Sequence, residues 1–214
     1  KDGYTVLNAP NPLRGLASDA ANVAAFINQN TIGPVVLVGH SYGGSVITEA
    51  ATSTPTVTAL VYINAYAPDE GENILALTAS EPGSALAVPD PSTVFDFVQY
   101  PGAPEGDVDT YVKPSLFREI LAARLPAKEA SVLAASQRPV TLSALQEPSG
   151  TPAWKTIKSY FFVGTTDQAI PAALQRTMAT RAGGVIVEKR ADHLSMLEMP
   201  RQVADLIKSA ARFN

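Results

Sequence analysis

Uninterrupted runs of apolar residues recur along the chain and predict strands that are buried on both faces. The clearest run is Val35–Val38, which follows Gly33-Pro34 and contains no polar residue. Such runs are typical of parallel sheets, because helices cover both faces of these sheets, whereas half-exposed strands alternate polar and apolar positions. We expect further strands at residues 5–8, 59–64, 159–163 and 185–189.

Helical periodicity fills the intervals between these runs. Ser18 or Asp19 is expected to cap a helix that continues to about Asn30. The apolar face of this helix would consist of Ala20, Val23, Ala24 and Ile27. Further helices are expected over residues 42–51, 171–181 and 200–212. The alternation predicts an α/β fold with a mostly parallel, doubly wound sheet.

The middle of the chain, residues 66–150, breaks this rhythm. It is rich in proline, and its expected helices at Ser115–Arg124 and Lys128–Ala135 are short. An excursion from the sheet explains this pattern better than a continued α/β repeat, and such excursions often cover a site. We therefore expect a core of residues 1–65 and 151–214, with a cap or lid inserted at 66–150.

The composition is typical of a single globular domain. The chain has 214 residues, of which 46% are hydrophobic and 17% charged, and this is enough to bury one core. The net charge of −4 and the pI near 5.2 give no electrostatic indication of nucleic-acid binding. No stretch approaches 18 consecutive apolar residues, so we expect no membrane span.

The chain has no cysteine, and its two histidines, His40 and His193, are far apart in the sequence. These facts exclude disulfides and a cysteine nucleophile, and we expect neither a metal nor a cofactor. Phosphate-binding and dinucleotide-binding glycine motifs do not occur either. The oligomeric state is left open, and we favour the cytoplasm as the compartment.

A serine motif lies where the run Val35–Val38 meets the next helix. The residues are Gly39-His40-Ser41-Tyr42-Gly43, followed by a second glycine. Gly-x-Ser-x-Gly between a buried strand and a helix is typical of a nucleophile elbow, in which a sharp turn exposes the serine hydroxyl. We expect Gly39 and Gly43 to be required because larger side chains would collide with the tight backbone. Ser41 is therefore the candidate nucleophile.

A serine nucleophile needs a base within hydrogen-bond reach. His40 is a poor candidate, because neighbouring side chains on such a turn point apart. His193 follows the last expected strand, in a loop where an α/β sheet assembles its site. We therefore expect His193 to be the base.

The base in turn needs a carboxylate to orient it. Asp167 follows the expected strand at residues 159–163, which gives the chain order Ser, Asp, His that α/β-hydrolases use. Asp69 and Glu70 follow an earlier strand and are the rival acids. Asp192 adjoins the base in sequence and would struggle to reach its ring. We favour Asp167.

An acyl-transfer site also needs donors for the oxyanion that forms on the substrate. The backbone N–H of Tyr42, directly after the nucleophile, is expected to be one donor. The second normally comes from a loop after an earlier strand, and the sequence contains no candidate for it. We therefore expect further residues to precede Lys1.

Four motifs in this order resemble the α/β-hydrolase superfamily over nearly the whole chain. The likeness is closest to the small bacterial esterases related to the plant methylesterase and hydroxynitrile lyase group. The motifs are Gly39-His40-Ser41-Tyr42-Gly43-Gly44, residues 65–71 (AYAPDEG), residues 164–171 (GTTDQAIP) and residues 192–197 (DHLSML). The resemblance implies a nucleophile at Ser41, an acid at Asp167 and a base at His193. The first strands and the His-Gly loop of the family have no counterpart in this sequence.

The resemblance implies a carboxylic ester hydrolase, with a small-molecule ester as its partner. In the lyase branch a lysine follows the catalytic histidine and an acidic residue precedes the serine. This chain has Leu194 and His40 at those positions, which favours ester hydrolysis. The alternatives are a hydroxynitrile lyase or cofactor-free perhydrolase on the same scaffold, and a non-catalytic binding protein with a hydrolase fold.

Overall fold

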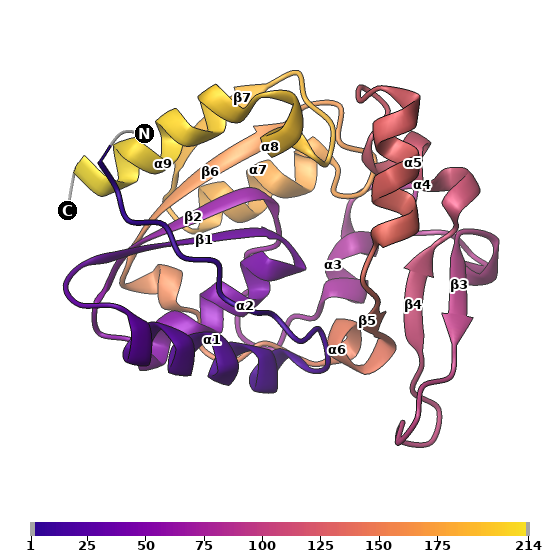
Figure 1. Ribbon diagram of the computed structural model, residues 1–214, viewed down its shortest axis with the longest axis horizontal. Coiled ribbons are helices and arrows are strands. Elements are labelled where there is room, and N and C mark those ends of the chain that lie inside the picture. Colours follow the sequence, from indigo (N-terminus) through magenta and orange to yellow (C-terminus); the bar gives the residue numbers. More distant parts are fainter. Residues whose placement is uncertain (1–2, 213–214) are drawn as a thin grey trace.

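The computed structural model describes residues 3–212, and its main feature is a parallel sheet with the strand order β1-β2-β6-β7 (Figure 1). All three strand pairs in this sheet are parallel. The strands are β1 (Val35–Ser41), β2 (Val57–Ala65), β6 (Lys158–Gly164) and β7 (Val185–Lys189). Four of the five expected strands are therefore confirmed as a parallel sheet.

Strand β2 shows why its sequence is apolar throughout. Leu60 and Tyr62 face one side of the sheet, and Val61 and Ile63 face the other, and all four are at most 2% exposed. The Tyr62 ring stacks on Phe161 of the neighbouring strand, with ring centroids 4.5 Å apart. A strand that is buried on both faces has no position for a solvated polar side chain.

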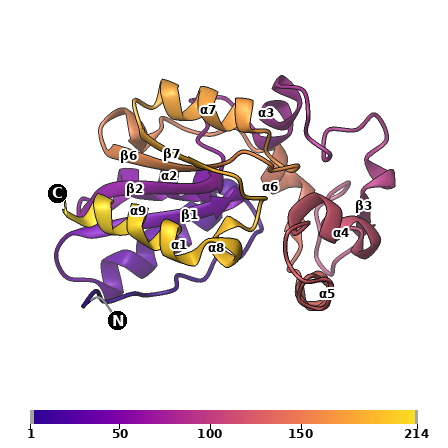
Figure 2. The same ribbon diagram turned by 90° about the horizontal axis from the view of Figure 1, so that it is seen from above.

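Helices cover both faces of the sheet, as the alternating pattern predicts (Figure 2). On one face, α2 (Tyr42–Ala50) packs on β1 and β2, and α7 (Ala172–Arg181) packs on β6. Helix α1 (Leu16–Asn30) lies against α2. The other face is covered by α9 (Pro200–Arg212), which α8 (Ser195–Glu198) precedes. In residues 3–212 no helix combines the length and apolarity that a bilayer span requires.

Residues 66–150 contain a second, antiparallel sheet that the sequence pattern did not predict. This sheet has the order β3-β4-β5 and lies beside the main body in Figure 1. Its strands are β3 (Phe95–Val98), β4 (Asp109–Val112) and β5 (Val140–Thr141). The helical elements of this part of the chain are α3 (Ile74–Ser80), η2 (Pro91–Thr93), α4 (Pro114–Leu121), α5 (Ala127–Ser136) and α6 (Leu142–Gln146). The division into a core and a cap stays a prediction.

Two expectations about the first strands are wrong. Residues 5–8 do not form a strand, because no strand lies beside them within residues 3–212, and Val6 is 84% exposed. Strand β1 is not buried on both sides either. It forms an edge of the described sheet, and Val38 is 39% exposed.

Helix α1 begins at Leu16, before the expected cap at Ser18 or Asp19. The carboxylate of Glu147 accepts hydrogen bonds from the backbone N–H groups of Leu16 and Ala17. A distant residue therefore satisfies the first donors of the helix, a role that a local capping pattern cannot reveal.

Candidate active site

Ser41 lies at the junction of β1 and α2 with φ 53° and ψ −126°, a backbone conformation that non-glycine residues rarely adopt. Gly39 is required here, because a Cβ atom on it would lie 2.5 Å from the Gly43 carbonyl oxygen. Gly44 is equally constrained, because a Cβ would collide with the backbone of Tyr66. The expectation for Gly43 is wrong: a Cβ there would meet no atom within 4 Å outside its own helix.

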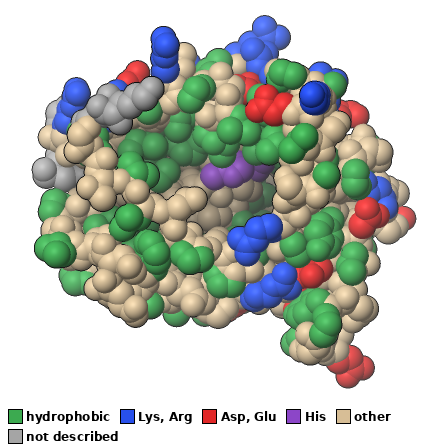
Figure 3. All heavy atoms as spheres, viewed as in Figure 1, with side chains coloured by type: hydrophobic (Ala, Val, Ile, Leu, Met, Phe, Trp, Pro, Cys, Tyr) green, Lys and Arg blue, Asp and Glu red, His purple; other side chains and the backbone are tan. Residues whose placement is uncertain are grey.

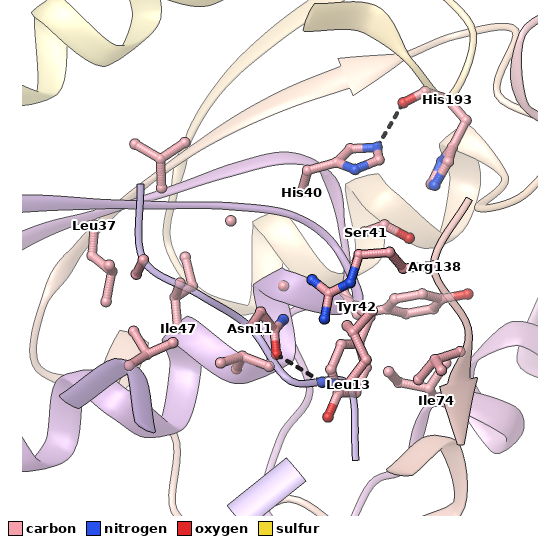
Figure 4. A pocket seen from close by; sticks show the side chains of 18 of the residues that line it. Asn11, Leu13, Leu37, His40, Ser41, Tyr42, Ile47, Ile74, Arg138 and His193 are labelled. Atoms are coloured by element: carbon pink, nitrogen blue, oxygen red, sulfur yellow. Dashed lines mark hydrogen bonds between the residues drawn. The ribbon is translucent and has the colours of Figure 1, made fainter. Parts of the chain in front are cut away.

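His193 and Asp167 come together from the loops that follow β7 and β6. The Nδ1 atom of His193 lies 3.0 Å from Oδ2 of Asp167, and both residues are 4% exposed. Figure 4 shows the His193 ring and the Ser41 hydroxyl directed toward one another at the wall of one pocket. Within residues 3–212 the Ser41 hydroxyl makes no hydrogen bond. Catalytic hydrogen bonds of this kind often tighten only in the substrate complex.

The Asp167 carboxylate accepts five hydrogen bonds. Its Oδ1 accepts the backbone N–H groups of Ala169 and Ile170, at 2.8 and 2.9 Å. Its Oδ2 accepts the side-chain amides of Asn64 and Gln175, both at 2.9 Å, as well as the His193 ring. Burial acts to raise the pKa of Asp167, but the base and these donors outweigh it and hold the pKa below its usual value.

The rival acids point elsewhere. Asp69 forms an ion pair with Lys155, at 2.7 Å. Glu70 accepts a hydrogen bond from the Thr151 hydroxyl. The Asp192 carboxylate accepts a threonine hydroxyl and a backbone N–H. Of these carboxylates and Asp167, only the last contacts the ring of the candidate base in the described residues.

His40, a poor candidate for the base on sequence grounds, contacts the backbone of His193 instead. Its Nε2 lies 2.9 Å from the His193 carbonyl oxygen, and the two ring centroids are 4.6 Å apart. A carbonyl only accepts hydrogen bonds, so Nε2 carries the proton. Burial and, to a smaller extent, the nearby His193 ring lower the pKa of His40 to about 3. His40 is therefore neutral at ordinary pH.

Tyr42, the residue directly after Ser41, fastens the start of α2 to α1. Its hydroxyl donates to Oδ2 of Asp19, at 2.8 Å, and the Asp19 side chain is fully buried. Burial and this carboxylate raise the pKa of Tyr42, so the phenol stays protonated. The backbone N–H of Tyr42 is thereby held at the amino end of α2, where the helix dipole is positive.

A largely apolar cleft of about 2150 Å³ contains Ser41 and His193 in its wall. Figure 3 shows this hollow with histidine in its depth and hydrophobic side chains around it. The charged residues in the lining are Glu81, Arg138 and Lys208, and Figure 4 shows Arg138 extending into the pocket. Within residues 3–212 no group of three His, Cys, Asp or Glu residues could hold a metal ion.

Sequence reasoning missed three polar residues that surround the predicted acid and base: Asn64, Gln175 and His40 in its supporting role. Asn64 could have been found, because it is the polar residue that ends the apolar run of β2 at the carboxyl edge of the sheet. Gln175 lies within the helical pattern of α7 and gives no such signal.

The sequence matches the model of the alpha/beta hydrolase family over residues 5–206. A carbendazim hydrolyzing esterase from Nocardioides sp. (strain SG-4G) is 40% identical over 63 residues, which are 29% of this chain and 26% of that protein. The chain thus aligns with about a quarter of that relative.

Two solved structures show the same fold at low sequence identity. Polyneuridine aldehyde esterase is 18% identical, with a TM-score of 0.76 over 94% of this chain and 81% of its own. A methylesterase protein from Arabidopsis is 16% identical, with a TM-score of 0.71 over 99% of this chain and 84% of its own. These two likenesses show the fold, and the family match over residues 5–206 confirms the resemblance to the α/β-hydrolase superfamily.

Proposed function

Because the chain belongs to the alpha/beta hydrolase family, we propose that it is a cofactor-free serine esterase that cleaves small or medium carboxylic esters. One observation carries the proposal most directly. The buried His193–Asp167 pair faces a serine on a strained strand-to-helix turn, in the wall of an apolar cleft. Nucleophile, base and orienting acid in this arrangement are the requirements for acyl transfer.

The reaction begins when Nε2 of His193 takes the Ser41 proton and Ser41 Oγ attacks the ester carbonyl. The tetrahedral intermediate collapses as the imidazolium returns the proton to the leaving alcohol, which gives an acyl-enzyme on Ser41. A water molecule then attacks the acyl group with the same base and releases the carboxylic acid. Asp167 holds the tautomer of His193 and stabilises the imidazolium at each step.

The developing oxyanion is stabilised by the backbone N–H of Tyr42. This donor lies at the positive end of α2, and the Tyr42–Asp19 hydrogen bond fixes the helix start. A rigid donor stabilises transition-state charge without reorganising during the reaction.

The cleft supports an apolar ester as the substrate class. Its walls are largely hydrophobic, and residues 66–150 supply part of them, as a cap would. Two relatives are named as esterases: the carbendazim hydrolyzing esterase from Nocardioides and the methylesterase from Arabidopsis. Their names support an ester bond as the bond that is cleaved.

The direct test compares Ser41→Ala with Ser45→Ala in hydrolysis of p-nitrophenyl acetate. Ser45 lies in α2, the helix that begins directly after Ser41, and its side chain is fully buried, so it is a matched control. Removal of the nucleophile should lower kcat by about 10⁴-fold or more, whereas the control should stay near wild type. Equal activity of the two variants would contradict a role for Ser41.

Product analysis separates the other activities of this scaffold. Release of cyanide from a cyanohydrin, with no carboxylate from esters, would indicate a lyase. Peracid formation from acetate and hydrogen peroxide would indicate a perhydrolase. Binding of esters without turnover by the wild-type protein would indicate a non-catalytic binding protein.

A further inference from the structure

An irregularity in the parallel sheet lies directly opposite the candidate nucleophile. Along the β1–β2 pair, His40 is opposite Ile63, but Ser41 is opposite Ala65, so Asn64 is left over as a bulge. Asn64 has φ 43°, in the left-handed region that asparagine tolerates better than most residues. Bulges next to active sites re-aim a side chain. Here the bulge directs Asn64 away from the regular alternation of β2.

The Asn64 side chain is fully buried and bridges the candidate acid to the loop of the candidate base. Its Nδ2 donates to Oδ2 of Asp167 at 2.9 Å and to the carbonyl oxygen of Asp192 at 3.1 Å. Its Oδ1 accepts the Ser195 hydroxyl at 2.5 Å. Asp192 precedes the base directly and Ser195 follows it by two residues. One amide therefore touches the acid and both flanks of the base.

Chemistry fixes which way this amide points. An ionised carboxylate and a backbone carbonyl can only accept hydrogen bonds, so the amide nitrogen must face Asp167 and Asp192. The amide oxygen then faces Ser195, whose hydroxyl can donate. All three partners are satisfied in this orientation and in no other. An ionised aspartate at position 64 has the same shape but has no hydrogen for either acceptor.

We propose that Asn64 is a positioning residue that holds the Asp167 carboxylate and the His193 loop in register with Ser41. The inference rests on the proposed function, because it assigns Asn64 to the same reaction. The bulge places the Asn64 amide, and the Ser195 hydroxyl orients it. The two N–H groups of the amide then hold Asp167 and the His193 loop together. Gly164 leaves room for this amide, since a Cβ on Gly164 would collide with Asn64 Nδ2.

Asn64→Asp and Asn64→Gly test the proposal in complementary ways. Asn64→Asp keeps the shape but places a second acceptor beside Asp167. Asn64→Gly removes the side chain and relieves the left-handed backbone. Both should lower kcat for p-nitrophenyl acetate by about 100-fold, because small misplacements of a catalytic group have effects of this size. A merely structural role would be rescued by glycine, which fits the backbone.

Gln175→Met is the matched control for the bridge. Gln175 also donates to Oδ2 of Asp167 at 2.9 Å, but it donates in addition to the carbonyl oxygen of Ile170 and to no residue of the base loop within residues 3–212. If Asn64 acted only on the carboxylate, the Gln175 variant would lose as much activity as Asn64→Gly. The proposal expects a loss at least about tenfold smaller.

Two readouts make the result decisive. In Asn64→Asp, the acid limb of the kcat/KM profile should move, because a second buried carboxyl group then titrates beside Asp167. In Asn64→Gly, the low-field NMR signal of the proton on His193 Nδ1 should shift or broaden. Wild-type kcat and an unchanged signal in a folded Asn64→Gly protein would overturn the inference. Absence of ester turnover in the wild-type protein would instead overturn the proposed function.

Discussion

Acidification should destabilise the folded protein through His40, which holds the backbone of the candidate base. His40 is neutral in the fold, because burial lowers its pKa from 6.5 to about 3. The unfolded chain binds a proton at this residue below pH 6.5, whereas the folded chain does so only near pH 3. The contribution of His40 to the free energy of unfolding is therefore fully present above pH 6.5 and is lost as the pH falls toward 3.

The size of this effect follows from the two pKa values. The difference between 6.5 and about 3 corresponds to at most about 5 kcal/mol in total. Between pH 7 and pH 5 the expected loss is about 2 kcal/mol, with a slope approaching about 1.4 kcal/mol per pH unit. The charged or titratable neighbours of the ring are His193 and Asp167.

Urea denaturation of the wild type and of His40→Gln at pH 7, 6 and 5 measures this contribution. Glutamine keeps an N–H donor for the His193 carbonyl but does not titrate, so the free energy of unfolding of the variant should fall less on acidification. The wild type and His40→Gln have all other titratable groups in common. The difference between their pH dependences therefore gives the contribution of His40 to the free energy of unfolding. Parallel curves for the two proteins between pH 7 and pH 5 would refute the reasoning.

Three further predictions concern the site itself. Asp167→Asn should lower kcat by about 10⁴-fold, because the base loses its orienting charge; a loss below about tenfold in ester hydrolysis would argue for another acid. Asp69→Asn, at the rival acid, should change kcat by less than about twofold, and a large loss would reopen that assignment. Tyr42→Phe should lower the free energy of unfolding by about 1–3 kcal/mol in urea denaturation, because buried Asp19 loses a donor; no change would show that the hydrogen bond adds no stability.

The sequence was sufficient to predict those parts of the fold and site in which one local pattern is compatible with one structure only. The apolar runs of β2 and β6 predicted buried strands because a strand covered on both faces admits few polar residues. The glycine-flanked serine predicted the sharp turn at Ser41, which the left-handed φ confirms. The meeting of His193 with Asp167 followed from chain order, because the carboxyl ends of parallel strands share one edge of a sheet.

The sequence was insufficient where partners are distant or strands are short. β3 and β4 have four residues each, and their pairing depends on tertiary contacts more than on periodicity. The Glu147 cap on α1 joins residues about 130 positions apart. The strand expected at residues 5–8 failed because an extended segment needs a neighbouring strand to bond with.

The role of Asn64 was also out of reach of pattern reasoning. Its side chain points to the acid because the β1–β2 register shifts by one residue at this position. No residue of the run Leu60–Ile63 predicts that shift. A polar residue at the end of a buried strand was the available signal, and it marks a position without specifying its partners.

Covalent capture of the intermediate tests the central claim most directly. The protein is mixed with p-nitrophenyl acetate, quenched in acid within the first turnover, digested and analysed by mass spectrometry. We predict one acetyl group per chain, on Ser41, in step with a burst of p-nitrophenolate. Consumption of the ester with no acetyl group on Ser41, or with the group on another residue, would contradict the account.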